Sequence, residues 1–128
     1  MEMSEAADFQ KFEDCAREIF SRQFGMHLKS GYVQGVPKKF DMVSSDGRIV
    51  GDAKYLTMVR GKAIPPAKFS VIAEHVWLLE KTTAIHKFIV FGNDRRVPEE
   101  WLKRYSHLVG GVEFYFLDER NRKIERLK

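Results

Sequence analysis

The most informative segment of the chain is residues 39–55, which read KFDMVSSDGRIVGDAKY. Two runs of alternating apolar and polar residues flank a Ser-Ser-Asp-Gly cluster, and an Asp-Gly pair between such runs is a strong signal for a tight β-hairpin. With Asp46 and Gly47 at the centre of the turn, the numbers of paired residues sum to 93. This register predicts that Asp41 lies directly opposite Asp52.

The two opposed acids need a physical explanation. Directly opposed residues of an antiparallel pair have Cβ atoms about 4.5–5.5 Å apart, and like charges there are destabilising. Strand alternation also puts Lys54 on the face of Asp52, whereas Ala53 points the other way. A divalent cation held by both carboxylates would remove the repulsion, since Mg²⁺ is usually bound through one or two carboxylates, waters and phosphates. The alternative is a solvated hairpin face whose charges extend into water.

Asp41 followed by Asp52-Ala53-Lys54 resembles the signature of the PD-(D/E)xK nuclease superfamily, whose members share the restriction-endonuclease-like core. That signature is an acid on one hairpin strand, then acid, any residue and lysine on the next; Phe40 stands where the family often has proline. The resemblance implies that Asp41, Asp52 and the carbonyl of Ala53 hold one or two Mg²⁺ or Mn²⁺ ions against a phosphodiester. Lys54 would then orient or help deprotonate the attacking water.

Glu13 is a further candidate for the site. A helix is expected over Ser4–Phe24, and at about 100° per residue Glu13 falls inside its apolar face, where a charge is costly unless it is paired or bound to a metal. One interpretation is a glutamate at the edge of the stripe whose carboxylate reaches water. The resemblance offers another, because the family's first helix often directs a glutamate at the metal within a Glu-x-x-Ala-like pattern, as in Glu13 to Ala16.

The segment after Lys54 is basic. Residues 55–68 contain no acid, hold Arg60, Lys62 and Lys68, and include a glycine and a Pro-Pro pair that mark a loop before a helix. A basic loop that begins at the candidate catalytic strand suits phosphate contacts, so we expect these three residues to bind nucleic acid. An ordinary solvated loop is the alternative interpretation.

The remaining periodicity predicts an α/β fold. The expected elements are an irregular strand within His27–Gly35, a well-buried helix over about Ala67–Thr82, a strand covered on both faces at Phe88–Phe91, a short helix from Pro98 to about Leu108, and a last strand at Val112–Leu117. The order α-β-β-β-α-β-α-β, with a mixed central sheet flanked by helices, matches the restriction-endonuclease-like core. The charged segment from about Asp118 is expected to form a frayed tail.

Composition bounds the class of protein. The 128 residues suit one domain, 1–128, and 44% hydrophobic with 31% charged residues is typical of a globular protein. No segment is apolar enough for a membrane span, the N-terminus is unlike a signal peptide, and a single cysteine, Cys15, fits a reducing cytosol, so a cytoplasmic location is expected. Residues 1–18 carry a net charge of −4 and the other 110 carry +8. The basic part suits a polyanionic partner.

The sequence therefore predicts a metal-dependent nuclease, with DNA as the favoured substrate. Two alternatives stay open: a catalytically silent module of the same fold that binds nucleic acid or protein, and a metal-free structural subunit with an incidental motif. The four histidines show no metal-ligand spacing. The apolar run Trp77-Leu78-Leu79 is compatible with a homodimer or a larger complex.

Overall fold

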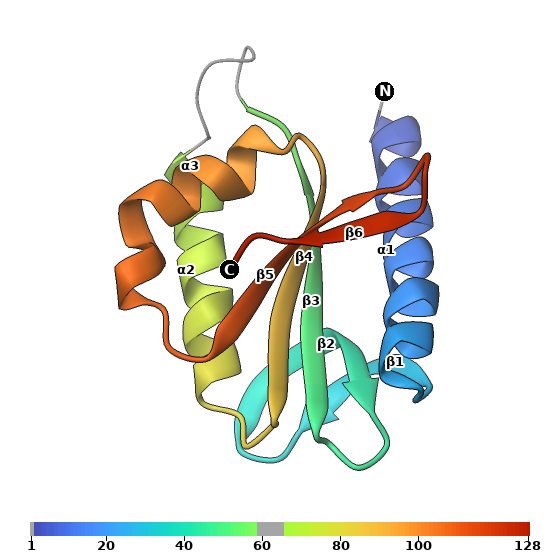
Figure 1. Ribbon diagram of the computed structural model, residues 1–128, viewed down its shortest axis with the longest axis vertical. Coiled ribbons are helices and arrows are strands. Elements are labelled where there is room, and N and C mark those ends of the chain that lie inside the picture. Colours follow the sequence, from blue (N-terminus) through green and yellow to red (C-terminus); the bar gives the residue numbers. More distant parts are fainter. Residues whose placement is uncertain (1, 59–65) are drawn as a thin grey trace.

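The structure is a computed structural model and describes residues 2–58 and 66–128. In these residues a six-stranded mixed sheet lies between helix α1 (Glu2–Phe24) on one face and helices α2 (Pro66–Glu80) and α3 (Arg96–Tyr105) on the other (Figure 1). The strands follow one another across the sheet in chain order: β1 (Leu28–Val33), β2 (Val36–Ser44), β3 (Ile49–Leu56), β4 (His86–Asn93), β5 (Val112–Asp118) and β6 (Lys123–Arg126). A 3₁₀ turn, η1 (Ser106–Leu108), follows α3.

The pairing of the strands makes the sheet mixed. Strand β2 is antiparallel to both of its neighbours, β1 and β3. Strands β3, β4 and β5 run parallel, and β6 is antiparallel to β5. The parallel neighbours are joined through helices, as parallel strands require. The predicted α/β class, the mixed sheet and the parallel β4–β5 pair are confirmed.

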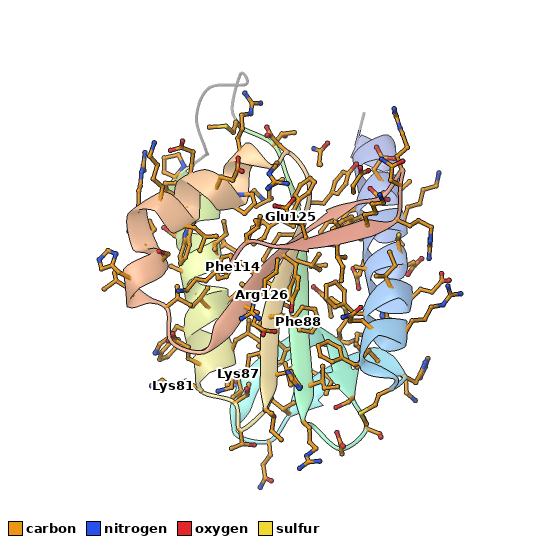
Figure 2. All side chains as sticks on the ribbon, viewed as in Figure 1. Lys81, Lys87, Phe88, Phe114, Glu125 and Arg126 are labelled. Carbon is orange, nitrogen blue, oxygen red and sulfur yellow. The ribbon has the colours of Figure 1, made fainter. Side chains whose placement is uncertain are left out.

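The sheet separates two apolar cores, and β4 contributes to both. Phe88 and Val90 pack with Phe12 and Phe20 of α1, whereas Ile89 packs on the side of α2 and α3. Figure 2 shows the division: the labelled Phe88 lies toward α1 and Phe114 of β5 lies toward α2. This confirms that β4 is covered on both faces.

The C-terminal segment does not fray, so the expectation of a frayed tail from Asp118 is wrong. Strand β6 pairs with β5, and beyond it the Leu127 N–H donates to the Phe114 carbonyl at 2.7 Å. The Arg95 guanidinium donates two hydrogen bonds to Glu125, at 2.6 and 2.5 Å. The charged residues of β6 are typical of an edge strand, because charged side chains that extend into water prevent pairing with other chains.

Helix α2 is buried along one stripe only. Ile72, Val76 and Leu79 are buried, whereas the Trp77 side chain is 55% exposed, so the prediction of a helix buried around most of its circumference is wrong. Trp77 borders an open apolar hollow of about 320 Å³ between α2 and α3, whose far side includes Trp101. In the part of the chain that the structure describes, no helix is both long and apolar enough to cross a membrane.

Candidate functional site

The hairpin between β2 and β3 forms as its turn residues predict. Gly47 adopts a left-handed conformation, with φ of +72°, and its N–H donates to the Ser44 carbonyl at 3.0 Å. The Asp46 carboxylate accepts hydrogen bonds from the Ser44 hydroxyl and the Arg48 N–H, at 2.8 and 3.0 Å. The strands pair Val43 with Val50 and Met42 with Gly51, which is the predicted register.

Beyond Gly51, carboxylate oxygens of the two acids accept the hydrogen bonds that backbone carbonyls would accept in a regular pair of strands. The Asp41 N–H donates to Oδ1 of Asp52 at 3.2 Å, and the Ala53 N–H donates to Oδ2 of Asp41 at 2.8 Å. Both carboxylates therefore lie between the strands and close to each other. The structure brings together the two acids that the register places opposite one another.

Asp52 is fully buried, and besides Asp41 a lysine and a histidine lie against its carboxylate. Its Oδ2 lies 3.1 Å from Nζ of Lys38, which comes from β2, and 3.3 Å from Nδ1 of His75, which comes from α2. The Asp52 side chain is 0% exposed and that of Lys38 only 15%. Despite these distances, neither Oδ2 of Asp52 nor Nδ1 of His75 has a partner with hydrogen-bond geometry among the residues that the structure describes.

Burial and charge shift the protonation of the site. Burial, followed by the charge of Asp52, raises the pKa of Asp41 to about 7, although the hydrogen bond from the Ala53 N–H opposes this. Burial lowers the pKa of Lys54, against the attraction of Asp52. Burial and the nearby charge of Lys54 lower the pKa of His75 to about 4, so its imidazole is neutral at pH 7.

Glu13 lies beside Asp41 with Arg17 between them. The Arg17 guanidinium forms an ion pair with Glu13 at 2.6 Å and donates to the Asp41 carbonyl oxygen at 3.3 and 3.4 Å. The Glu13 side chain is 14% exposed, and its charge contributes to the raised pKa of Asp41. Glu13 is thus neither solvated nor alone, because Arg17 partners it at the edge of the site.

Of the three basic residues expected to contact nucleic acid, one can be located. Lys68 is exposed in the first turn of α2, the helix that also carries His75, and its charge helps to lower the pKa of Lys54. Arg60 and Lys62 lie outside the described residues.

Lys38, His75 and Arg17 belong to the site, although the sequence patterns do not identify them as site residues. Lys38 alternates with the buried Val36 and Phe40, a spacing that puts all three on one face of β2. His75 lies on the α2 stripe of Ile72, Val76 and Leu79, at helical spacing. The stripe was hidden because α2 reads as apolar on nearly all sides.

The resemblance implies a divalent metal ion, and the donor atoms present fit one. Oδ2 of Asp52 is buried and has no hydrogen bond to any part of the chain that the structure describes, and Asp41 supplies a second carboxylate beside it. Across residues 2–58 and 66–128, no three His, Cys, Asp or Glu side chains are grouped to hold an ion. Two carboxylates, with water and phosphate completing the shell, are nevertheless a common Mg²⁺ arrangement.

No protein-family model matches the chain, and no curated protein matches its sequence. Functional inference for this chain therefore depends on the residues of the Asp41–Asp52 site and on their geometry.

Proposed function

We propose that the chain is a metal-dependent nuclease that hydrolyses phosphodiester bonds, with DNA as the favoured substrate. The observation that carries this proposal is the contact between the carboxylates of Asp41 and Asp52, inside the sheet and next to Lys54. A purely structural hairpin would gain stability from backbone pairing at these positions, whereas buried like charges cost stability. Strongly shifted titratable groups that gather in this way are typical of catalytic sites.

Asp41 and Asp52 are the metal-holding residues in this proposal, with the Ala53 carbonyl as a further oxygen ligand. When bound, the ion lowers the pKa of a bound water and offsets charge on the phosphate oxygens. The Arg17 guanidinium donates a hydrogen bond to the Asp41 carbonyl oxygen and so holds the backbone of Asp41 in place. An ion pair with Glu13 in turn holds the Arg17 guanidinium. Glu13 therefore supports the Asp41 side of the site from helix α1.

Lys54 is the proposed proton-transfer residue. Its lowered pKa makes a neutral amine more accessible at Nζ, which can accept a proton from the attacking water. In its charged form the same group stabilises negative charge that develops on the phosphate. Lys68, exposed in the first turn of α2, is proposed to contact a neighbouring phosphate, as are Arg60 and Lys62 of the basic segment.

Cleavage of a labelled panel tests this function. Duplex, single-stranded, flap and four-way-junction DNA, together with RNA, are incubated with Mg²⁺, Mn²⁺ or EDTA. We expect metal-dependent cutting that Asp52→Asn and Lys54→Met abolish and that Lys103→Met, which alters an exposed lysine of α3, retains. Cutting that persists unchanged in Asp52→Asn would assign the activity to some other site.

A second candidate function is a catalytically silent module that binds nucleic acid. One observation favours it: the Lys38 ammonium lies 3.1 Å from Oδ2 of Asp52, so the buried acid has a positive neighbour without any metal. This candidate predicts DNA binding that weakens with salt, no cleavage with either metal, and unchanged binding in Asp52→Asn.

A further inference from the structure

We propose that His75 is a ligand of the divalent cation at Asp52, so that the site takes a transition-metal ion in preference to Mg²⁺. This inference rests on the proposed function and deepens it by adding a nitrogen ligand from helix α2 and by naming the class of ion.

The first observation is a pair of neighbouring buried atoms, one on strand β3 and one on helix α2, neither of which is hydrogen-bonded to a residue that the structure describes. Nδ1 of His75 and Oδ2 of Asp52 are both buried and lie 3.3 Å apart, and within residues 2–58 and 66–128 neither atom makes a hydrogen bond. Buried polar atoms without partners are rare and costly, and two of them side by side indicate something that both can contact. A cation is such a partner for a carboxylate oxygen and an imidazole lone pair.

The distance between the two atoms fits a shared ion. Ligand atoms held about 2.0–2.2 Å from one ion are separated by roughly 2.8–3.1 Å in octahedral and roughly 3.3–3.6 Å in tetrahedral geometry. The observed 3.3 Å is in the tetrahedral range. The two atoms do not form a hydrogen bond with each other at this distance.

The electrostatics of the position already favour positive charge. Nζ of Lys38 lies 3.1 Å from the same Asp52 oxygen and supplies that charge. An ammonium offers only hydrogen atoms and one unit of charge, whereas a divalent ion can bond to both the oxygen and the imidazole nitrogen. The long Lys38 side chain, which comes from an edge of the site on β2, would move aside when an ion is bound.

The donor set determines which ion is preferred. Carboxylate and water ligands suit Mg²⁺, Ca²⁺ and Mn²⁺, while imidazole raises the affinity for later divalent metals such as Co²⁺, Ni²⁺ and Zn²⁺. A site in which Asp52 and His75 both bind the ion is therefore expected to bind Co²⁺ more tightly than Mg²⁺. The buried stripe of α2 holds the His75 ring against the sheet, so this preference is built into the fold.

Calorimetric titration of the full chain, prepared without a histidine tag, measures this preference. Co²⁺ and Mg²⁺ are titrated separately into wild type, His75→Ala, Asp52→Asn and the control His107→Ala, which removes an exposed imidazole from η1. We expect His75→Ala to lose about tenfold or more of the Co²⁺ affinity and to change the Mg²⁺ affinity by less than about twofold. Asp52→Asn should weaken both ions, and His107→Ala neither.

The outcomes separate this inference from the proposed function. If Asp52→Asn weakens both ions but His75→Ala binds Co²⁺ as wild type does, the metal site stands and His75 is not a ligand. If wild type binds neither ion, both the metal-dependent function and the role of His75 are wrong.

A measurement on the wild-type chain covers the case in which His75→Ala does not fold. Zn²⁺ is added to protein with ¹⁵N-labelled histidine, and the ring nitrogen signals of the exposed His27, His86 and His107 are assigned from their alanine variants. The remaining signal belongs to His75. We expect one equivalent of Zn²⁺ to shift that signal and leave the other three in place; a His75 signal that does not move would overturn the inference.

Discussion

Asp41 and Asp52 face each other across the hairpin, yet they lie in different environments. Asp52 is fully buried and has the Lys38 ammonium beside it, whereas Asp41 is partly buried and close to the negative charges of Asp52 and Glu13. As a result Asp41 holds its proton more tightly than an ordinary carboxyl group. The cost of the like-charge contact therefore appears mainly at Asp41.

The raised pKa of Asp41 predicts how stability depends on pH in the metal-free protein. The pKa is about 7 in the folded state against 3.8 for an unperturbed group, so the stability that the proton confers is complete below pH 3.8 and is lost as pH rises through 7. His75 acts in the opposite sense between about pH 4 and 6.5, because its pKa is lowered. A comparison with Asp41→Asn isolates the contribution of Asp41.

Denaturant unfolding in EDTA measures the free energy of unfolding of wild type and Asp41→Asn at pH 5 and pH 8. We expect the variant's advantage over wild type to be larger at pH 8, by at most about 2–3 kcal/mol. An advantage that does not change with pH would show that Asp41 titrates as an ordinary carboxyl group.

Removing the Asp52 carboxylate should have the opposite effect on stability to removing the charge of Asp41. The loss of the Asp52 carboxylate leaves the Lys38 ammonium, whose side chain is 15% exposed, without its partner. Breaking a buried ion pair from one side typically costs about 3–5 kcal/mol. We expect Asp52→Ala to destabilise the metal-free protein by this amount in denaturant unfolding, and Lys38→Met to recover part of the loss in the same background. A fully stable Asp52→Ala protein would contradict the pairing with Lys38.

The sequence predicts the contact of Asp41 with Asp52 but not the contacts of Lys38 and His75. The hairpin register depends on turn residues within a few positions of each other, so local patterns are sufficient to determine it. The position of His75 depends on how α2 is rotated against the sheet, and that rotation follows from tertiary packing. A residue in an apolar helical stripe is indistinguishable from core until the facing surface is known.

At the scale of elements, β3 is one of the two central strands of the sheet and packs tightly against its neighbour β4. Gly51 immediately precedes Asp52, and a Cβ at this position would overlap the ring of Phe88. Because Phe88 is fully buried in the core beneath α1, the ring has little freedom to move. Gly51 thus allows β4 to approach the strand that carries Asp52 and Lys54.

We expect Gly51→Ala to destabilise the protein by about 1–3 kcal/mol or more, as insertion of a methyl group into a packed core usually does. Gly31→Ala on β1 is the matched control, because a Cβ there meets no atom of the described residues within 4 Å. Unfolding curves of the two variants measure the difference. Equal stabilities would mean that the contact between Gly51 and Phe88 is looser than the structure has it.

Strand β6 is the element that the sequence does not predict. Its residues are mostly charged, and a hydrophobicity pattern cannot distinguish an edge strand with solvated side chains from a frayed tail. Contacts with residues distant in the sequence hold β6 in place. It forms backbone hydrogen bonds with β5, and the exposed Glu125 forms an ion pair with Arg95 at the start of α3. These contacts join segments that lie far apart in the chain.

Deletion of residues 119–128 tests the order of this strand. The deletion removes the Phe114 hydrogen bonds to the C-terminal backbone and uncovers the buried Leu117, so we expect a clear loss of stability in denaturant unfolding. Glu125→Ala, which removes only an exposed ion pair, should cost less than about 1 kcal/mol. A deletion variant as stable as the full chain would mean that the segment is a frayed tail after all.

For the whole molecule, the sequence predicts the class of fold better than it predicts which helix faces are exposed to solvent. Alternation in β2 and β3, the continuous apolar run of β4 and the strand-helix-strand order lead to an α/β fold with a mixed sheet, and the structure has one. The exposed side of α2 was not predicted, because a helix apolar on most sides reads as buried. Whether Trp77 and the hollow beside it serve a homodimer stays a prediction.

The site draws on both helical layers, because α1 and α2 cover opposite faces of the sheet (Figure 1). Arg17 of α1, paired with Glu13, contacts Asp41, whereas His75 of α2 lies beside Asp52. The acids therefore sit where β2 and β3 separate, between the two helical layers. This is an unfavourable arrangement for stability alone, and it is the reason for assigning the pair a function.

The most direct test of that assignment is the nuclease activity of Asp41→Asn, measured with Mn²⁺ on labelled duplex DNA beside its free energy of unfolding at pH 8. We predict a protein that is more stable than wild type and does not cut, since the substitution relieves the like-charge contact and removes a metal ligand. A variant that cuts as fast as wild type would contradict the account, because the contact between Asp41 and Asp52 would then have no catalytic role.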